Sequence, residues 1–336
     1  MMQNFGRRYD QLRRRVDRRL TTMAIHGAPA ELLQACRYVL TGGGKRLRAI
    51  LVLLSSEAVG GTARRALDAA AAIEIMHNFT LVHDDVMDHA GARRGRPTVH
   101  VRWSLNTALL TGDTLLAVAY MSLMKTGRVA NCDMVRLFTQ GVIDVCEGQA
   151  LDMEFENRED VTVGDYFAMI EKKTGRLIST ATELGARVGG GTAAQAQALH
   201  RFGHYLGRAF QLQDDLLDVF GNEKEFGKTI GGDIVEGKRT FLLLTALERA
   251  RGNDRQLLKR VLRQNRGAAR PSTARARHEF VAGIRSLYAT YGVIDETRRL
   301  VQQNTRRALA VLSTLPASPA RDMLAWLSNT LIHRAS

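Results

Sequence analysis

The 336-residue chain is poor in cysteine, proline and aromatic residues, and it contains no long apolar run. Its three cysteines, Cys36, Cys132 and Cys146, are too few and too scattered for a disulfide framework or a zinc site, which favours a reducing, cytoplasmic setting. With five prolines and no Pro/Gly/Ser-rich linker, no domain boundary is evident, so we expect one domain over residues 1–336. There is neither a run of eighteen apolar residues nor the apolar core of a secretory signal. We therefore expect a soluble protein without stable membrane insertion.

Positive charge is in large excess. The net charge is +14, and 48 basic residues minus 8 lysines leave 40 arginines. Because only 6% of the residues are aromatic and no zinc finger or aromatic-studded sheet is evident, we expect no nucleic-acid binding. In the N-terminal segment, Leu12, Val16 and Leu20 share one side of a predicted helix and arginines occupy the other. These arginines would face solvent, and attraction to an anionic membrane surface is the alternative interpretation.

Apolar residues recur with helical spacing along almost the whole chain, and strand-like alternation is nearly absent. We predict helices over residues 5–25, 30–40, 45–59, 63–88, 99–125, 131–157, 163–188, 192–220, 233–250, 254–265, 273–290, 293–313 and 318–333. Residues 266–277, rich in arginine with a glycine and a proline, are predicted to form an exposed loop. The helices at 63–88 and 192–220 are apolar on more than one face, which is typical of central helices. The predicted fold is an all-α helical bundle with a central cavity.

Two pentads of the form DDxxD lie within these apolar helices, at residues 84–88 and 214–218. Residues four apart share a helix face, so each pentad presents its first and fifth carboxylates together. Repelling carboxylates on an apolar helix need a compensating cation, and hard oxygen ligands suit Mg²⁺ that is shared with substrate phosphates. A solvated acidic face would explain one such pentad more readily than two. The pair therefore predicts a metal-bridged phosphate site.

Basic residues follow glycine or acidic signals near both pentads. Residues 42–48, GGGKRLR, form a glycine-rich turn that leads into a helix, where N–H groups, Lys45 and Arg48 would attract an anion. After the first pentad, a loop carries the adjacent Arg93 and Arg94, which can face two different phosphates. Lysines follow at positions 172, 173, 228 and 238. An isolated lysine pair is usually a solvated face, but this series recurs in order beside the acidic clusters.

These segments resemble the motifs of the trans-isoprenyl diphosphate synthases, the polyprenyl synthetase family, and in particular its short-chain, geranylgeranyl diphosphate synthase type. The matching segments are GGGKRLR at 42–48, HDDVMDHAGARRGRPT at 83–98, GD at 112–113, GQALD at 148–152, KTG at 173–175, QLQDDLLD at 211–218, GK at 227–228 and GGDIVEGKRT at 231–240. The resemblance implies the all-helical isoprenoid synthase fold, a homodimer, and a prenyltransferase that uses three Mg²⁺ ions per active site. It implies condensation of isopentenyl diphosphate with dimethylallyl, geranyl or farnesyl diphosphate.

The resemblance also implies roles for individual residues. Asp84 and Asp88 would bind two Mg²⁺ ions and Asp214 a third, with Asp85, Asp215 and Asp218 in support. The pocket for isopentenyl diphosphate would consist of Gly44, Lys45, Arg48, His77 and Arg94. The allylic diphosphate would be held by Arg93, Lys173, Thr174, Gln211, Lys228 and Lys238. The residues that carry catalysis would be Asp84, Asp88, Arg93, Lys173, Asp214 and Lys228.

Product length would depend on the residues just before the first pentad. Phe79 lies five positions and Thr80 four positions before Asp84, so the phenyl ring would lie about one and a half helical turns below the metal ions. A bulky ring there resembles the floor of short-chain members of the family, and the pentad lacks the two-residue insertion of many bacterial farnesyl diphosphate synthases. Together these features favour the twenty-carbon geranylgeranyl diphosphate, with farnesyl diphosphate as the alternative. A class I terpene cyclase is a more distant alternative, but it would carry an Asn/Ser/Glu metal motif in place of the second pentad. A non-catalytic subunit of a heteromeric synthase would have lost aspartates from a pentad.

Overall fold

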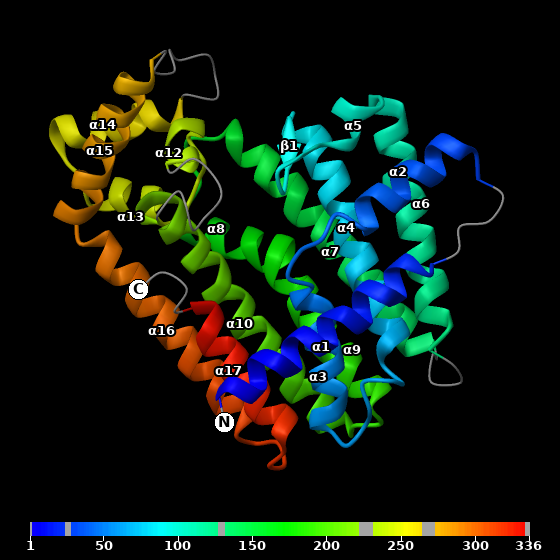
Figure 1. The fold of residues 1–336 in the computed structure, drawn as a ribbon. Helices are drawn as coiled ribbons and strands as arrows, with labels where there is room; N and C mark the ends of the chain where they lie inside the picture. The colour runs from blue at the N-terminus through cyan, green and yellow to red at the C-terminus, as the bar shows by residue number, and fades with distance from the viewer. Residues whose placement is uncertain (1, 24–27, 127–131, 222–230, 264–272, 333–336) are drawn as a thin grey trace. The chain divides into compact units, whose positions relative to one another are not determined.

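The computed structural model is almost entirely helical (Figure 1) and describes residues 2–23, 28–126, 132–221, 231–263 and 273–332. Its helices are α1 (Met2–Thr21), α2 (Ala30–Leu40), α3 (Leu47–Ala58), α4 (Leu67–Met87), α5 (Val99–Arg102), α6 (Leu105–Met124), α7 (Cys132–Glu156), α8 (Val163–Ile170), the π-helix η2 (Glu171–Gly175), α9 (Arg176–Val188), α10 (Ala193–Phe220), α12 (Gly232–Glu236), α13 (Phe241–Arg249), α14 (Gly252–Leu262), α15 (Ala274–Thr290), α16 (Val293–Leu312) and α17 (Pro319–Ile332). The prediction of an all-α fold is confirmed.

Two compact units account for the internal packing of the chain. Unit 1 comprises Met1–Ile143, Leu177–Gly203 and Val311–Trp326, and unit 2 comprises Asp144–Arg176, His204–Ala310 and Leu327–Ser336. Several limits between the units fall inside single helices, namely α7, α10, α16 and α17. The expectation of one domain over residues 1–336 stays a prediction.

The core of unit 1 is built on α4, which packs along α6 and is covered by α1, α2 and α3. The alanines of α4 at positions 69–72 are fully buried, as are Ile73, Ile75 and Met76, so this helix is buried on more than one face as expected. Helix α9 approaches α3 closely at Gly185, where a Cβ atom would lie 2.3 Å from the carbonyl oxygen of Val52. Only glycine permits that approach.

Unit 2 has its own apolar core, formed by residues of α8, α10, α13, α15 and α16. The largest fully buried side chains there are Tyr166 and Tyr288. The rings of Tyr166, Phe167 and Phe241 lie 5.4–6.3 Å apart, which fixes α8 against α13. The second DDxxD pentad therefore stands on an α10 segment that is packed on its apolar side.

Three predicted helices are interrupted. The helix predicted over 99–125 breaks at Trp103, and Ser104 caps α6 by accepting a hydrogen bond from the Thr107 amide. The helix predicted over 163–188 contains the π-helical turn η2. The helix predicted over 233–250 stops at Gly237, whose φ of +66° ends α12. Periodicity alone did not reveal these interruptions because apolar spacing continues across each of them.

The structure also contains a small β-hairpin that the sequence did not predict. Strands β1 (Ala92–Arg93) and β2 (Arg96–Pro97) pair antiparallel between α4 and α5. Two-residue strands are too short to show period-two alternation. Most of the loop predicted over 266–277 lies outside the described residues, and from Ala274 onward the chain forms α15.

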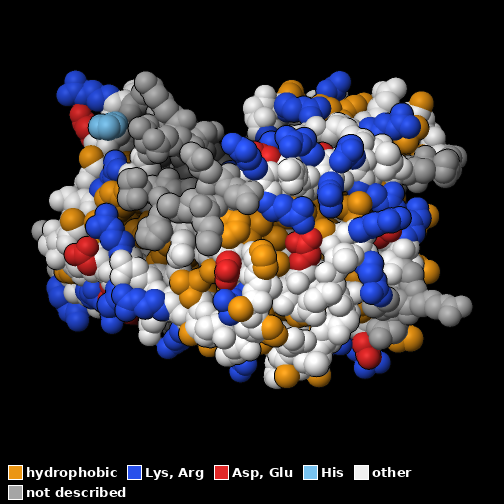
Figure 2. Space-filling model, turned by 60° about the horizontal axis from the view of Figure 1, so that its bottom comes forward, with side chains coloured by type: hydrophobic (Ala, Val, Ile, Leu, Met, Phe, Trp, Pro, Cys, Tyr) orange, Lys and Arg blue, Asp and Glu red, His pale blue; other side chains and the backbone are white. Residues whose placement is uncertain are grey.

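Surface composition follows the excess of arginine. Lys and Arg side chains are spread over the face seen in Figure 2, and Asp and Glu side chains are fewer there. Within the described residues, α6 alone is long and apolar enough to cross a membrane by length and composition, a test that core helices of soluble proteins also pass. Its inner side packs on α4.

Candidate active site

The first aspartate pentad occupies the last turn of α4 in unit 1. Asp84 is half-buried, Asp85 is buried and Asp88 is exposed. Asp88 caps the helix with near-helical dihedral angles, and its backbone N–H donates to the Asp84 carbonyl oxygen at 2.8 Å. The helical spacing therefore extends through the whole pentad, and its first and fifth carboxylates are the more accessible ones. The predicted metal ligands of this pentad, Asp84 and Asp88, are therefore its more accessible carboxylates, and the predicted supporting residue, Asp85, is buried.

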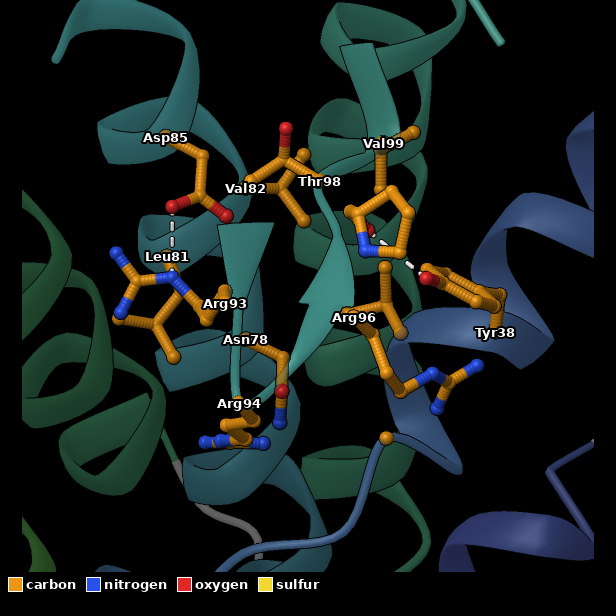
Figure 3. Close-up of a pocket in the computed structure, with 13 residues that line it drawn as sticks. Tyr38, Asn78, Leu81, Val82, Asp85, Arg93, Arg94, Arg96, Thr98 and Val99 are labelled. Carbon is orange, nitrogen blue, oxygen red and sulfur yellow. Dashed lines mark hydrogen bonds and ion pairs between the residues drawn. The ribbon is translucent and has the colours of Figure 1, made fainter. Parts of the chain in front are cut away.

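The hairpin that follows α4 carries the two adjacent arginines. Its turn residues Arg94 and Gly95 both have positive φ, at 54° and 71°, as a type I′ turn requires. The Arg93 Nε donates to the Asp85 carboxylate at 2.7 Å, and the Arg94 Nη1 donates to the Gly43 carbonyl oxygen at 2.6 Å. Figure 3 shows Arg93 extending toward Asp85 on α4. The two guanidinium groups therefore face different partners, as their position in a loop suggested.

The glycine-rich turn lies directly against Arg94. Gly43 and Gly44 have φ values of +72° and +122°, which side chains other than glycine rarely adopt. A Cβ atom at Gly44 would lie 3.0 Å from the Arg94 guanidinium carbon. Gly44 is therefore needed both for the backbone turn and for the approach of Arg94. Lys45, the next residue, is exposed.

The structure corrects the predicted start of the helix that follows this turn. The helix starts at Leu47 rather than residue 45, and Arg46 is its N-cap in the left-handed conformation with φ of 53°. Arg46 is 3% exposed, and its guanidinium donates to Asp17 at 2.8 Å, to Glu74 at 3.2 Å and to the Leu40 carbonyl oxygen at 2.8 Å. Arg46 is therefore a core residue that joins α1, α2 and α4. The signal that could have found it was Glu74, a carboxylate inside an apolar helix.

Arg48 and His77 form the other side of this basic cluster. The Arg48 Nη1 lies 3.1 Å from the His77 Nε2, and because a guanidinium can only donate, the imidazole nitrogen accepts. Burial lowers the pKa of His77 well below its usual value, and the charges of Arg48, Arg94 and Arg93 lower it further. His77 is therefore neutral at pH 7, with its ring proton on Nδ1.

Phe79 lies on α4 below the first pentad and is 7% exposed. Its ring meets the His83 imidazole edge to face, with centroids 5.0 Å apart. His83 in turn lies against α6 at Gly112, where a Cβ atom would come within 2.1 Å of the imidazole Nε2. Thr80 is half-buried, and its hydroxyl donates to the His77 carbonyl oxygen. Phe79 is therefore a buried ring that packs on His83, and His83 lies in a close contact between α4 and α6.

The second aspartate pentad lies on α10 in unit 2, beside a polar cleft of about 770 Å³ including its open mouth. The cleft is lined by Asp152, Tyr166, Met169, Ile170, Lys173, Thr174, Gln211, Asp214, Asp215, Asp218, Asp233, Lys238, Arg239 and Thr240. Asp214 is half-buried, whereas Asp215 and Asp218 are buried. Five of the residues predicted for the allylic diphosphate and the third metal ion are thus brought together: Lys173, Thr174, Gln211, Asp214 and Lys238. Lys228 lies outside the described residues.

A chain of hydrogen bonds fixes the polar side chains in this cleft. The Thr174 hydroxyl donates to Gln211 at 2.9 Å, and the Gln211 amide donates to Asp215 at 3.0 Å. The Tyr166 hydroxyl donates to the second oxygen of Asp215 at 2.7 Å. The Lys173 ammonium donates to Asp152 at 2.5 Å. Asp215 is thus held from two sides, which leaves Asp214 as the accessible carboxylate beside it.

The carboxylates of the unit 2 cleft crowd one another. Burial raises the pKa of Asp215 to about 7, and the charge of Asp233 adds to this effect while hydrogen bonds from Gln211 and Tyr166 oppose it. Burial and Asp233 likewise raise the pKa of Asp218 to about 7. Such shifts mark a site where negative charge is poorly compensated. A bound cation would relieve this repulsion.

The lysine and threonine of the KTG segment sit on the π-helical turn η2, which glycines on two helices approach. A Cβ atom at Gly148 of α7 would lie 2.3 Å from the Lys173 amide nitrogen, and one at Gly207 of α10 would lie 2.7 Å from Gly175 Cα. π-helical turns inside α-helices are frequent at functional sites. The glycines of the GQALD and KTG segments therefore serve close packing around Lys173.

The donor set fits divalent metal ions that are shared with a substrate. Among the described residues, no three His, Cys, Asp or Glu side chains are grouped to enclose a metal ion by themselves. The accessible oxygen ligands are Asp84 with Asp88 on α4 and Asp214 on α10. Mg²⁺ commonly takes one or two carboxylates and completes its coordination with water and phosphate oxygens. Each pentad therefore fits a hard cation that needs diphosphate oxygens to complete its shell.

Several residues that line the unit 2 cleft were not predicted from the sequence. Tyr166 and Asp233 both line the unit 2 cleft; Tyr166 donates to Asp215, and the charge of Asp233 raises the pKa of both Asp215 and Asp218. Arg239 donates to the carbonyl oxygens of Glu156, Arg158 and Gly237, so it ties the cleft wall to the end of α7. Asp233 and Arg239 lie inside the GGDIVEGKRT segment, and that was the available signal. Tyr166 carried no signal in the sequence.

Comparison with known proteins identifies the family. The family model described as polyprenyl synthetase matches residues 29–277, which contain both pentads, the glycine turn and the hairpin. The chain belongs to this family. It is an isoprenyl diphosphate synthase, and thus a prenyltransferase, as the motifs indicated. Its family uses divalent metal ions and takes isopentenyl diphosphate and allylic diphosphates as substrates.

Similar proteins cover the chain over nearly its whole length. A short chain isoprenyl diphosphate synthase from Methanothermobacter thermautotrophicus is 39% identical over 332 residues, which cover 98% of this chain and 97% of the relative. An all-trans-nonaprenyl-diphosphate synthase from Rhodobacter capsulatus is 35% identical over 311 residues, covering 92% and 91% of the two chains. Isoprenyl diphosphate synthases with different product lengths are therefore similar to this chain.

Two solved structures illustrate the agreement in fold. A geranylgeranyl pyrophosphate synthetase from Pyrococcus horikoshii matches with a TM-score of 0.88 at 33% identity, covering 98% of both chains. A polyprenyl synthase from Caulobacter crescentus, complexed with calcium and isoprenyl diphosphate, matches with a TM-score of 0.87 at 27% identity, covering 100% of this chain and 98% of the other. The isoprenoid synthase fold that the sequence motifs implied is confirmed.

Gly148→Ala tests the close packing around Lys173. The added Cβ atom cannot fit beside the Lys173 backbone, so α7 must move and the contact of Lys173 with Asp152 changes. We expect prenyl transfer to fall by roughly tenfold or more, with a loss of about 1–3 kcal/mol in the free energy of unfolding. Gly283→Ala on α15 is the control, because a Cβ atom there meets nothing within 4 Å. Equal rates and equal urea midpoints for Gly148→Ala and the wild type would contradict this account.

Proposed function

We propose that this prenyltransferase condenses isopentenyl diphosphate with an allylic diphosphate and releases geranylgeranyl diphosphate, a short-chain all-trans product. The observation that carries this proposal is how each pentad divides its carboxylates between buried and accessible ones. Each keeps one or more buried carboxylates on protein partners and presents its first aspartate, Asp84 or Asp214, as an accessible ligand. The basic groups beside each pentad suit diphosphate oxygens.

Isopentenyl diphosphate would bind to the basic cluster of unit 1. Lys45, Arg48 and Arg94 supply the positive charge, and Gly44 leaves room for the Arg94 guanidinium. His77 is neutral and accepts a hydrogen bond from Arg48, so it orients that guanidinium without adding charge. Guanidinium groups bind phosphate oxygens in a geometry that an ammonium cannot reproduce. This assignment needs no metal ion for the homoallylic substrate.

In unit 2 the allylic diphosphate would be held by Lys173 and Lys238. The resemblance to the family assigns Arg93 of the hairpin and Lys228 to the same substrate. Asp84, Asp88 and Asp214 would hold up to three Mg²⁺ ions, which when bound supply positive charge that stabilises the departing diphosphate. Asp85 orients Arg93, since it accepts the hydrogen bond from the Arg93 Nε. Thr174 and Gln211, joined by a hydrogen bond, would present their oxygen atoms to the developing allylic cation. Asp215 and Asp218 would support Asp214.

The chemical step requires no strong side-chain nucleophile. The allylic C–O bond breaks to a delocalised carbocation, the double bond of isopentenyl diphosphate attacks it, and loss of one proton gives an allylic diphosphate five carbons longer. The diphosphate that has just departed is basic enough to take that proton. The side chains described above bind, orient and stabilise charge, which is the larger part of catalysis in reactions of this kind.

The double variant Asp84→Ala plus Asp214→Ala tests the roles of both pentads. We expect the condensation rate to fall by about a hundredfold or more, measured with labelled isopentenyl diphosphate and farnesyl diphosphate in excess Mg²⁺. The matched control is Asp133→Ala plus Asp295→Ala, which removes one exposed aspartate from each unit. Chelation with EDTA should abolish the wild-type rate, and Mg²⁺ should restore it. Full condensation by the Asp84/Asp214 variant would refute the assignment.

Product length is assigned to the floor formed by Phe79. The ring is buried and backed by His83, so a twenty-carbon tail would end against it. We expect Phe79→Ala to lengthen the products by one or more five-carbon units and Phe79→Leu to do so less, as read by chromatography of the dephosphorylated products. Phe138→Leu, in the fully buried core of unit 1, controls for general loosening. An unchanged product spectrum in Phe79→Ala would place the floor elsewhere, and a fifteen-carbon wild-type product would favour the farnesyl alternative.

A homodimer is proposed from the outer face of α6. Its exposed apolar side chains are Leu105, Leu109, Leu110, Met121 and Met124, each at least 41% exposed. An apolar strip of this kind is typical of a surface that another chain covers.

Leu110→Glu plus Met121→Glu should therefore shift the protein to monomers in sedimentation equilibrium, because two charges would be desolvated at the interface. The charge-matched control Gln302→Glu plus Gln303→Glu changes exposed positions of α16 and should leave the mass unchanged. A wild-type protein that sediments as a monomer would contradict the proposal.

A further inference from the structure

The hairpin β1–β2 cannot hold its own geometry. It has two residues per strand, and isolated two-stranded ribbons are marginal in water. Arg93 and Arg96 lie directly opposite each other across the strands, where like charges repel. Arg94 adds a non-glycine residue with positive φ, which costs conformational energy. Contacts outside the hairpin must therefore fix the position of Arg94.

One set of outside contacts comes from Tyr38 on α2. The Tyr38 hydroxyl donates to the Pro97 carbonyl oxygen of β2 at 2.8 Å. The Arg96 guanidinium carbon lies 3.7 Å from the centroid of the Tyr38 ring, which is the distance of a stacked cation–π contact. Figure 3 shows Arg96 extending from the hairpin toward Tyr38, while Arg93 extends toward Asp85. The two opposed guanidinium groups are thus drawn apart by different partners.

Tyr38 also lies just before the glycine turn in sequence. It lies four residues before Gly42, and the Arg96 Nη1 lies 3.5 Å from the position that a Cβ atom of Gly42 would occupy. The same turn accepts the hydrogen bond of Arg94 at Gly43. The turn and the hairpin are therefore joined twice, once through Arg94 and once through the stack of Arg96 on Tyr38.

Neighbouring aromatic and basic groups hold the Tyr38 ring in place. Trp103 meets it edge to face with centroids 5.2 Å apart, and the Arg102 guanidinium carbon lies 4.4 Å from its centroid. Both residues belong to the α5 end, so they follow the hairpin in sequence. The ring is fixed from the segment after β2 as well as from β2 itself. Because Tyr38 is held on several sides, its contacts with Arg96 and Pro97 can fix the position of the hairpin.

We propose that Tyr38 is a positioning residue for isopentenyl diphosphate, because it sets the distance between the glycine turn and Arg94 through its contacts with Arg96 and Pro97. The inference rests on the proposed function, in which Lys45 and Arg48 after the turn and Arg94 on the hairpin bind one diphosphate. In this role Tyr38 acts through Arg96 and Arg94. Arg93 is anchored separately on Asp85, so the allylic substrate depends on Tyr38 much less.

Tyr38→Phe removes only the hydroxyl, and Arg96→Met removes only the stacked cation. We expect Tyr38→Phe to raise the KM for isopentenyl diphosphate by about three- to tenfold, and Arg96→Met to raise it by a comparable factor. The KM for farnesyl diphosphate and kcat at saturation should stay within about twofold of the wild type. Arg96→Lys keeps a cation near the ring and should restore part of the loss. Tyr120→Phe is the matched control, since it removes another half-buried unit 1 hydroxyl bond, to Thr139, away from the hairpin.

A double-mutant comparison shows whether Tyr38 acts through Arg94. Arg94→Met alone should raise the KM for isopentenyl diphosphate, and adding Tyr38→Phe to it should change that KM by less than about twofold. Fully additive effects would overturn the inference, as would equal increases in the KM of both substrates or an unchanged KM in Tyr38→Phe and Arg96→Met. If Arg94→Met leaves the KM for isopentenyl diphosphate unchanged, the proposed substrate assignment fails and takes this inference with it. Thermal unfolding of each variant separates loss of folding from loss of positioning.

Discussion

The buried ion pair between Arg46 and Glu74 is the constraint on which the basic half of the site depends. Both side chains are nearly inaccessible, and Arg46 adopts a left-handed backbone conformation that places its guanidinium between Asp17 of α1 and Glu74 of α4. Removing one partner of such a pair leaves a buried charge uncompensated, at a cost of about 3–5 kcal/mol. Arg46 therefore anchors the end of the glycine turn to the core. Because Arg46 is held by these contacts, Lys45 and Arg48 extend from a backbone that is anchored to the core.

The same logic governs both aspartate pentads. In each, the second aspartate is buried and held by protein donors: Asp85 by Arg93, and Asp215 by Tyr166 and Gln211. A buried carboxylate without such partners would be costly, so these contacts fix the rotation of the last turns of α4 and the matching turn of α10. That rotation decides which carboxylates remain accessible. In each DDxxD pentad, therefore, the contacts of the buried second aspartate orient the helix and leave the first aspartate more accessible.

The sequence predicted most of the helices and most of the site, and the exceptions share one physical cause. Helices 30–40 and 192–220 were placed to within a residue because their periodicity ends at proline or glycine signals. The π-turn at Lys173, the break at Trp103 and the hairpin at Arg93–Arg96 were missed because contacts distant in sequence help to stabilise each of them: Gly148 and Gly207 against the π-turn, and Tyr38 against both Trp103 and the hairpin. Arg46 and Tyr166 were missed for the same reason, since their partners Glu74 and Asp215 lie 28 and 49 residues away. The motif residues themselves could be found because function fixes their spacing along the chain.

The basic cluster around His77 in unit 1 and the carboxylate cleft of unit 2 differ in the sign of the electrostatic environment that they offer to a diphosphate. In unit 1, burial and the surrounding arginines depress the pKa of His77, which marks a positive field at that point. In unit 2, burial and neighbouring carboxylates raise the pKa of Asp215 and Asp218, which marks a negative field. A diphosphate can enter the first environment directly, whereas at the second it must arrive with cations. The homoallylic substrate keeps its diphosphate throughout the reaction and the allylic substrate loses it. In the proposed function, the basic cluster around His77 therefore takes the diphosphate that stays, and the carboxylates of the two pentads take, through metal ions, the diphosphate that leaves.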